Sequence, residues 1–442
     1  MNKSIVSVVR YEKPGESVRT AVQRSGGLDL MPSGSKVFIK PNVVFWTSKT
    51  DFPKWGVVTT SRVVEDTVVL LKEHGIRHIT IGEGPALPRP NDRETPARAF
   101  RRLGYYDLKD RYGVRVINTF EHPFERIRVD DNATLDFSRE ILKSDFVVNL
   151  PVLKTHAQTV VSLGIKNLKG TIDFDSRKKC HNADPGKDLH YMVSRLFLPM
   201  PPMFTLLDGI YTNERGPNTD GKARRTNLLV ASWDVLSADM VGAKILGYSP
   251  SEVPYIVHAA REKKKPIDFS DIEVVGERME DVAAHHDFAF PYNQAGTLPL
   301  SMEKMGITGL AYRKYDLTIC TFCSRLNRLM LMAIASAWKG KPFPEVEVLS
   351  GKVMKPTPGR KKTILLGKCV SESNRRDEGT REMIPIKGCP PDPKNAYKAL
   401  IRAGIDVDPE WFDHPEKLQQ VHMKRYLGKP EFDELFYRVA PC

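Results

Sequence analysis

The sequence predicts an α/β protein with a doubly wound, largely parallel sheet and a smaller C-terminal α/β domain. Strand-like and helix-like segments alternate over residues 1–280, which is typical of βαβ units. The same rhythm resumes after residue 300 and carries most of the cysteines. Residues 280–300 form the expected connection, so we predict domains over 1–280 and 300–442, the second with a helical tail.

Each element follows from a local pattern. Apolar runs bounded by turn residues predict strands at 5–10, 36–39, 78–81, 114–118, 145–150, 203–207, 227–231, 271–275, 317–319, 345–349 and 363–366. Apolar residues at helical spacing predict helices at 16–25, 61–74, 96–110, 159–169, 188–196, 236–246, 252–263, 326–338 and 394–402. The irregular segment 43–60, with Trp46 and Trp55, is expected to be either a lid or a surface loop.

Composition restricts the expected cellular compartment and the expected class of binding partner. The 442 residues contain no apolar run approaching 18 residues, and the N-terminal apolar run is too short for a secretory signal, so we expect a cytoplasmic protein without membrane spans. A net charge of +13 favours an anionic partner: a carboxylate or phosphate, or an acidic redox protein such as a ferredoxin. No aromatic RNA-binding signature or zinc-finger spacing supports nucleic acid.

Polar residues follow four predicted strands of the first domain. Since ligands of open α/β sheets bind beyond the carboxyl ends of the strands, these residues are expected to converge on one site: Lys40, Asn42, Glu83, Lys154, His156 and Asp208. Pro151 should end the strand 145–150 and place Lys154 and His156 in a loop. The helix 159–169, ended by Gly170, should add Lys166 and Lys169. The alternative is that each strand-end residue only caps a turn.

These residue types suggest an anion site with acid–base chemistry. We expect Lys40, Asn42, Lys166 and Lys169 to bind the substrate, because ammonium groups supply positive charge without a fixed geometry. His156 is the expected proton carrier, with an ordinary pKa near the working pH, and Lys154 acts beside it. Glu83 or Asp208 would orient the histidine or share the acid–base work.

Four cysteines predict a metal centre in the second domain. Cys320 and Cys323 precede a predicted helix, Cys369 follows a strand, and Cys389 precedes Pro390. A helix N-terminus favours the thiolate that binds metal, and four thiols without a histidine pattern suit a [4Fe–4S] cluster. Zinc is the competing metal, although its sites usually pair two Cys-x₂-Cys motifs, and free or redox-active thiols are the third possibility.

The motifs together resemble a known family. Lys40-Pro41-Asn42, Leu150-Pro-Val-Leu-Lys-Thr-His156, Lys166-Asn-Leu-Lys-Gly170, Leu207-Asp-Gly209 with Gly216-Pro217, and Asp234 followed by Asp239 in a Gly-Ala-Lys-Ile-Leu-Gly helix resemble the DUF362 family over roughly residues 36–247. The resemblance implies an iron–sulfur protein of undefined activity. This chain lacks the Cys-x₂-Cys-x₂-Cys-x₃-Cys run of fused ferredoxin modules, so their tandem-cluster relay is not carried over.

The sequence therefore predicts an oxygen-sensitive iron–sulfur oxidoreductase, suited to anaerobic conditions, that acts on a small anionic substrate. The alternatives are a non-catalytic iron–sulfur electron-transfer adaptor that docks acidic partners, a cluster-dependent lyase or isomerase, and a zinc-stabilised binding protein. Substrate, reaction direction, the role of Cys180 and oligomeric state are not encoded in any pattern that we recognise.

Overall fold

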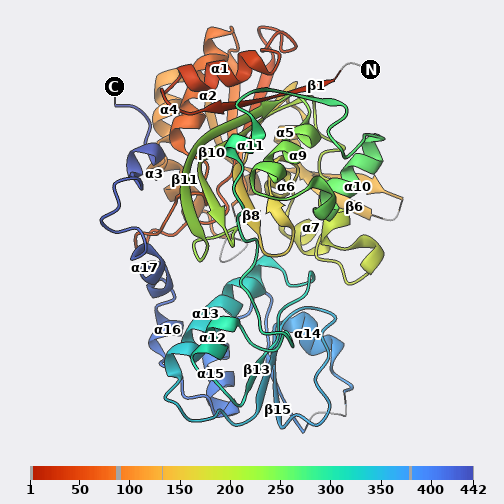
Figure 1. Ribbon diagram of the computed structural model, residues 1–442, viewed down its shortest axis with the longest axis vertical. Coiled ribbons are helices and arrows are strands. Elements are labelled where there is room, and N and C mark those ends of the chain that lie inside the picture. The colour runs from red at the N-terminus through yellow and green to blue at the C-terminus, as the bar shows by residue number, and fades with distance from the viewer. Residues whose placement is uncertain (1–2, 86–90, 132, 378–380, 442) are drawn as a thin grey trace.

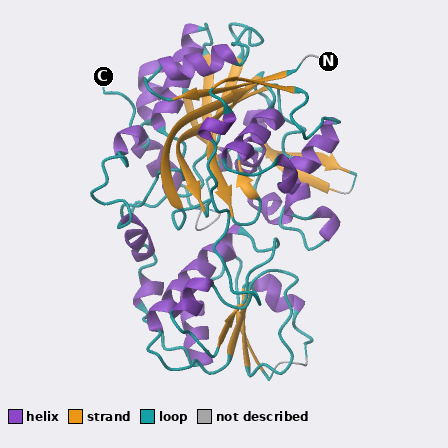
Figure 2. Cartoon of the chain, in the orientation of Figure 1, coloured by secondary structure: helices purple, strands orange, loops and turns teal. Residues whose placement is uncertain are grey.

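The structure is a computed structural model that describes residues 3–85, 91–131, 133–377 and 381–441. Two α/β units follow one another along the chain, a larger one at the top of Figure 1 and a smaller one below it. Each unit is built around its own sheet, as the orange strands of Figure 2 show. None of the helices in the described ranges is long and apolar enough to cross a membrane.

The larger unit contains a sheet of ten strands. Their order is β12 (Ile272–Gly276), β1 (Ser4–Arg10), β11 (Lys222–Ser232), β10 (Met203–Glu214), β7 (Phe146–Leu150), β2 (Lys36–Pro41), β3 (His78–Glu83) and β4 (Arg115–Asn118), with β8 (Val152–His156) and β9 (Val160–Ser162) beside β10. The pairings are parallel except those of β11 and the β8–β9 hairpin. The predicted α/β class with a largely parallel sheet is confirmed.

Helices cover both faces of this sheet, because strands such as β2 are apolar on both sides. Val37 and Ile39 pack into one core, while Phe38 between them packs into the other. The helices of this unit are α1 (Glu16–Arg24), α2 (Ser61–Glu73), α3 (Glu94–Arg102), α4 (Tyr105–Tyr112), α5 (Arg139–Leu142), α6 (Gly164–Asn167), α7 (Phe174–Lys179), α8 (Leu189–Val193), α9 (Val235–Ile245), α10 (Pro254–Lys263) and α11 (Met279–Val282). A separate hairpin, β5 (Phe124–Asp130) and β6 (Ala133–Ser138), and the short turns η1 (Thr119–Glu121), η2 (Leu168–Thr171), η3 (Pro185–Lys187) and η4 (Pro250–Glu252) complete it.

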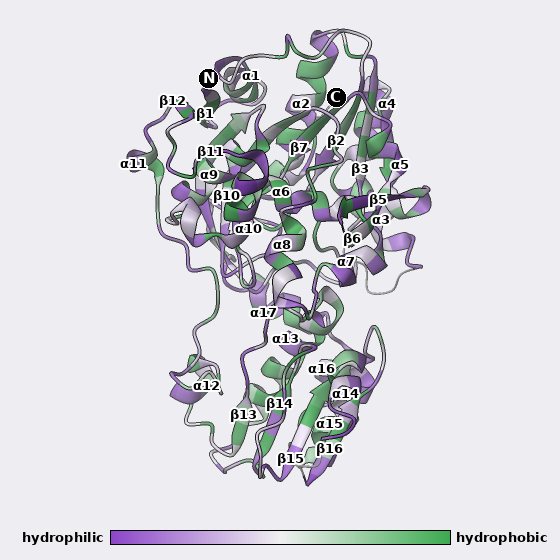
Figure 3. Ribbon diagram, turned by 90° about the vertical axis from the view of Figure 1, so that its right-hand side faces the viewer, coloured by the Kyte–Doolittle hydropathy of each residue, from purple (hydrophilic) through white to green (hydrophobic). Residues whose placement is uncertain are grey.

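The smaller unit holds a four-stranded, wholly parallel sheet in sequence order. Its strands are β13 (Leu310–Tyr312), β14 (Val346–Leu349), β15 (Lys362–Leu366) and β16 (Glu382–Ile386). Its helices are α12 (Leu300–Lys304), α13 (Thr321–Ala337), α14 (Lys368–Ser373) and α15 (Pro393–Ala403). The green strands of Figure 3 are apolar and lie at the centre of each unit.

The C-terminal segment returns from the smaller unit to the larger one. It contains α16 (Glu410–Asp413), α17 (Lys417–Met423) and η5 (Glu434–Tyr437), coloured dark blue in Figure 1. Trp55 packs against Tyr426 and Phe432, with ring centroids 5.2 and 5.4 Å away. Aromatic contacts therefore fix the C-terminal segment to the core of the larger unit.

The structure corrects three local predictions. Lys154 and His156 lie in strand β8 rather than in a loop, because the β-branched Val160 and Val161 pair with this strand as β9. The helix expected from residue 159 begins only at Gly164, where the backbone N–H groups of Gly164 and Ile165 donate to the Asp239 carboxylate. Gly170 consequently lies in η2 and is not a helix C-cap.

Three further segments show where the structure goes beyond the sequence expectation. The strand predicted to end before Asp208 continues to Glu214, since it pairs with β11 over almost its whole length. Residues 317–319 form no strand; they lie in the turn before α13. In the segment 43–60, Trp46 and Trp55 are buried in the core, so this segment packs against the larger unit.

Candidate functional site

A cavity of about 330 Å³ lies between the two units. One wall is formed by the strand ends and loops of the larger sheet, the opposite wall by α13, and the side by the connection around residues 289–302 and by α17. The positive charge of this lining is concentrated in Lys154, Lys166, Lys169, Arg177, Arg215, Lys314, Arg325, Arg328 and Arg425. The lining carboxylates are Glu83 and Asp220, and both are already paired with other cations.

The structure brings six of the predicted strand-end and helix residues to this cavity, which is lined by Asn42, Glu83, Lys154, His156, Lys166 and Lys169. Asn42 follows β2, Glu83 is the last residue of β3, two of the others belong to β8, and two follow β9. Lys40 and Asp208 do not line it. The expectation that parallel strand ends meet therefore holds for most of the set, but two members have other roles.

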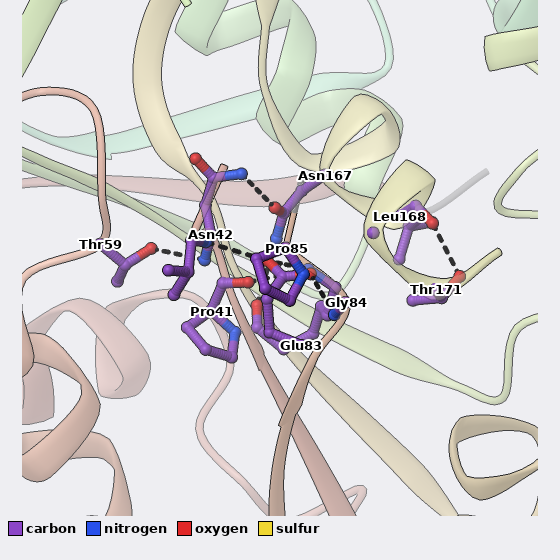
Figure 4. Close-up of polar contacts among 12 residues, drawn as sticks. Pro41, Asn42, Thr59, Glu83, Gly84, Pro85, Asn167, Leu168 and Thr171 are labelled. Carbon is purple, nitrogen blue, oxygen red and sulfur yellow. Dashed lines mark hydrogen bonds and ion pairs between the residues drawn. The ribbon is translucent and has the colours of Figure 1, made fainter. Parts of the chain in front are cut away.

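An asparagine network fixes the position of Lys154. The Lys154 ammonium donates to Asn42 Oδ1 at 2.6 Å and to the Val57 carbonyl at 2.7 Å. Asn42 in turn donates to Asn167 Oδ1, as Figure 4 shows, and Asn167 donates to Asn149 Oδ1 at 2.8 Å. Burial lowers the pKa of Lys154 to about 7, because its acceptors are neutral amides.

Lys40 and Glu83 form a closed pair beneath the cavity. The Lys40 ammonium is fully buried, 2.8 Å from Glu83 Oε2 and 2.8 Å from the Pro41 carbonyl. Glu83 also accepts from the backbone N–H groups of Val43 and Gly84. A Cβ at Gly170 would lie 2.6 Å from Lys40 Nζ, so only glycine fits over the pair. Lys40 is therefore structural, and Glu83 neither contacts nor orients His156.

Asp208 also has a structural role. It is buried within β10 and accepts from the backbone N–H groups of Thr60, at 2.7 Å, and Ile210, at 3.1 Å. Burial raises the pKa of this carboxyl to about 6. The prediction of a strand-end acid fails because β10 continues through Asp208, which anchors the start of α2 instead of facing the cavity.

Lys166 and Lys169 face the cavity without a carboxylate partner. No hydrogen bond or ion pair reaches the Lys166 ammonium from the residues that the structure describes, and burial lowers its pKa well below the usual range. Lys169 lies 2.7 Å from His181 Nε2, and burial lowers its pKa to about 8. His181 Nδ1 lies 3.0 Å from the Leu317 carbonyl, so the neutral ring donates there and accepts from Lys169.

His156 is buried beside these lysines. Its Nδ1 accepts from the Gln158 backbone N–H at 3.1 Å, so in the neutral ring Nε2 carries the proton. Burial, and then the positive charges of Lys166 and Lys169, lower the pKa of His156 well below its ordinary value. The premise of a histidine with an ordinary pKa is therefore wrong, and His156 is a neutral hydrogen-bond donor near neutral pH.

Sequence reasoning missed several arginines of the cavity. Arg177, in α7, donates to the carbonyls of Gly84 and Gly170 and stacks 4.7 Å from the Phe120 ring. Arg325 and Arg328, in the first half of α13, face the cavity from the other unit. The sequence feature that could have identified these two arginines is their spacing of three residues on a helix that is otherwise mostly apolar. Arg177 gave no such signal, because the short helix α7 was not predicted.

The four predicted cysteine ligands lie at the carboxyl edge of the smaller sheet. Cys320 and Cys323 begin α13 after β13, Cys369 follows β15 in the first turn of α14, and Cys389 follows β16. A hydrogen bond with Cys323 is the main cause that lowers the pKa of Cys320 to about 5. Cys389 interacts electrostatically with Cys320 and Cys369. Topology thus gathers all four on one edge.

This thiol edge faces the lysine-lined edge of the larger sheet. Gln158 donates to three carbonyls of the turn before α13, those of Asp316, Leu317 and Ile319. From the other side, Lys352, which follows β14, donates to carbonyls of residues 178 and 181. Lys169 interacts electrostatically with Cys320. Amines and thiols therefore meet across the interface between the units.

Within the described ranges, no group of three or more His, Cys, Asp or Glu side chains is arranged to hold a single metal ion.

Residues 37–244 match the family model described as a domain of unknown function (DUF362). This segment is a DUF362 domain. The match confirms the resemblance found in the sequence motifs, and it includes every lining residue of the larger unit from Asn42 to Asp220.

Two other comparisons accompany the DUF362 match. A thylakoid-associated protein of Synechocystis is 28% identical over 253 residues, which cover 56% of this chain and 74% of that protein. The apoprotein of lactate racemase from Thermoanaerobacterium thermosaccharolyticum is 12% identical with a TM-score of 0.34, and the match covers 55% of this chain and 57% of that chain. A structural likeness at this level carries no argument about fold or activity.

Proposed function

We propose that this DUF362 protein is an iron–sulfur enzyme, an oxidoreductase that binds a small carboxylate or phosphate in the cavity between its two units. One observation carries the proposal. The carboxyl edge of one parallel sheet presents lysines without counter-charges to the cavity, and the facing edge of the other carries four cysteines, of which Cys320 interacts electrostatically with Lys169. Burying an ammonium group without a counter-charge is energetically unfavourable, so an anion bound in the cavity would stabilise the lysines. A donor set made only of thiols suits iron–sulfur ligation.

The donor chemistry fits a [4Fe–4S] cluster held by Cys320, Cys323, Cys369 and Cys389. Cys320 is the N-cap of a 17-residue helix, where the helix dipole favours the thiolate form. Cys323 lies against Gly367, where an added Cβ would be 2.7 Å from its Sγ. Gly367 has φ +99, so a side chain there is disfavoured both by the backbone and by the thiol. When bound, such a cluster would supply or accept single electrons beside the cavity.

The chain's own residues would bind and orient the substrate. Lys154, Lys166 and Lys169 would contact the anion, and each would gain a counter-charge that restores its ordinary protonated state. Asn42 holds Lys154 in place. His156 would donate its Nε2 proton to the substrate as a hydrogen bond, because its Nδ1 is occupied as an acceptor.

The test is anaerobic purification of the whole chain, with iron, zinc and acid-labile sulfide analysis and a spectrum before and after dithionite. The proposal predicts about four irons and four sulfides per chain and a reducible brown chromophore. Cys320→Ser should lose most of both. A colourless protein that carries zinc, or no metal after anaerobic reconstitution, would contradict the iron–sulfur assignment.

Two glycine variants distinguish the effect of contact with the Cys323 thiol from the effect of general backbone strain. Gly367→Ala places a methyl group against Cys323 Sγ and should reduce the iron content by at least half. Gly359 has a comparable φ of +81 with nothing within 4 Å of an added Cβ, so Gly359→Ala carries the strain without the contact. Equal iron loss in both variants would show that strain, not the thiol contact, is responsible.

A second candidate is a non-catalytic electron carrier that docks an acidic redox partner such as a ferredoxin. Cys369 and Cys389 are exposed, and Lys178 and Lys368 interact electrostatically with Cys389. A basic surface around the thiols would attract acidic partners, and this binding should weaken steeply with salt. Ferredoxin binding that ignores salt would count against this candidate. Both candidates assume a reducing, cytoplasmic setting, in which thiols remain available for iron.

A further inference from the structure

Helix α13 packs one face into the core of the smaller unit and presents a second face to the cavity, and Leu331 and Ala335 contact both. Leu326, Leu329, Met330, Ala333 and Ile334 pack into that core. A second stripe faces the cavity at helical spacing and consists of Thr321, Ser324, Arg325, Arg328, Leu331, Met332 and Ala335. This stripe is polar and cationic in its first half and apolar in its second half.

The other walls of the cavity also carry charged side chains in one part and apolar side chains in another. Across from the apolar half of α13, the cavity is lined by Phe290, Tyr292, Pro299 and Met302 of the connection and by Leu418 of α17. Phe290 keeps 39% of its surface exposed, and Leu331 and Met332 are also only partly buried. Lys154, Lys166 and Lys169 lie at the other end, beside the start of α13. The cavity thus has one end with unpaired lysines and another end with mostly apolar side chains, where Arg215 is paired with Asp287 and lies 5.7 Å from the Phe290 ring.

We infer that the ligand of this cavity is an amphiphilic anion, with a phosphate or carboxylate head at the lysines and an apolar tail along the second half of α13. The inference rests on the proposed anion site and adds the class of its substrate. From Ser324 to Ala335 the helix rises about 16 Å at about 1.5 Å per residue. The cavity therefore has room for a tail and not only for a head group.

A small hydrophilic anion would leave this apolar wall in contact with water. A tail would remove water from Leu331, Met332 and Phe290 while the head neutralises the amines at the other end. Burial of each added methylene should strengthen binding about fourfold until the tail fills the apolar end. The head and the tail of the same ligand would thus contact two separate regions of the cavity.

The experiment is calorimetric titration of the whole protein with inorganic phosphate and with methyl, butyl and octyl phosphate below their micelle concentrations. The inference predicts that affinity rises about fourfold per methylene from methyl to butyl phosphate and remains high for octyl phosphate. Met332→Gln should reduce this gain at least tenfold for octyl phosphate. Ile401→Gln, which replaces a 40% exposed side chain on α15 away from the cavity, should leave the gain unchanged.

Different failures of this experiment have different meanings. Octyl phosphate that binds no tighter than methyl phosphate would overturn the tail while leaving the anion site intact. A gain with tail length that survives Met332→Gln would place the tail elsewhere and would also overturn the inference. Absence of binding for every phosphate would overturn the anion site, and the tail with it. Vesicles containing phosphatidic acid would show whether the same head and tail are also taken from a lipid surface.

Discussion

Lys40 and Lys166 are lysines of the same unit with opposite surroundings. Lys40 is fully buried and its ammonium is neutralised by Glu83 at 2.8 Å, with Gly170 packed directly over the pair. Lys166 faces the cavity, and no carboxylate or other hydrogen-bond partner reaches it from the described residues. We therefore expect the fold to depend on both partners of the Lys40–Glu83 pair, and Lys166, which has no such counter-charge, to be available for a ligand.

Removal of one partner from the closed pair should have the largest effect. Lys40→Met leaves the Glu83 carboxylate buried with only backbone donors, which should lower the free energy of unfolding by about 3–5 kcal/mol. Urea unfolding measures the change. The double variant Lys40→Met with Glu83→Gln should recover most of the loss, because no charge then remains unpaired. A loss below about 1 kcal/mol for the single variant would show that the pair is not needed.

The open lysine should behave in the reverse way. Lys166→Met removes an unpartnered ammonium, so it should leave the unfolding free energy unchanged or raise it by about 1 kcal/mol. The same change should weaken phosphate binding about 100-fold in calorimetry, because a charged contact to the anion is lost. Lys398→Met, at an exposed position of α15, is the matched control and should alter neither quantity. A large loss of stability in Lys166→Met would remove the distinction between the two lysines.

The pH dependence of anion binding follows from the depressed pKa values. In the free protein Lys154 and Lys169 have pKa values of about 7 and about 8, and a bound anion raises both. Binding therefore takes up protons above pH 7, and affinity should fall by up to about tenfold per pH unit per amine as pH rises from 7 to 9. Below pH 7 these two lysines are mostly protonated and contribute little further change. Affinity that rises with pH across this range would contradict the assignment.

His156 should have the smallest effect on binding. Because its Nδ1 accepts from Gln158 and burial lowers its pKa, it acts as a neutral donor. His156→Gln keeps a donor at a similar position, so phosphate affinity should change less than about tenfold. Titration of the variant beside wild type tests this, and a loss as large as that of Lys166→Met would show that His156 carries more of the binding than its neutral state allows.

The sequence predicted the sheets better than it predicted the site. Uninterrupted apolar runs identified strands such as β2, β7 and β15, because a strand buried on both faces leaves a strong local signal. Asp208 was misplaced because continuation of β10 depends on pairing with β11, which is distant in sequence. Lys40 was misassigned for a similar reason: its partner Glu83 lies on the neighbouring strand, and no local pattern reports which strands are neighbours.

The amines that line the cavity were only partly predictable. Lys154, Lys166 and Lys169 were found through their motif, but Arg325 and Arg328 reach the cavity only because the second unit folds against the first. The pKa of His156 depends on burial among lysines from other segments, which composition does not encode. Chemistry that depends on contact between the two units was therefore beyond the reach of a single sequence.

An anion that binds at the unpaired amines of the cavity should raise their pKa values, so protons should be taken up on binding. The most direct measurement is calorimetric titration of the protein with phosphate at pH 8 in two buffers of different ionisation enthalpy, which gives the number of protons exchanged on binding. The expected result is uptake of at least about one proton per anion, because at pH 8 Lys154 is largely deprotonated and Lys169 is about half deprotonated before the anion binds. Binding without proton uptake, or no binding of phosphate at all, would contradict it.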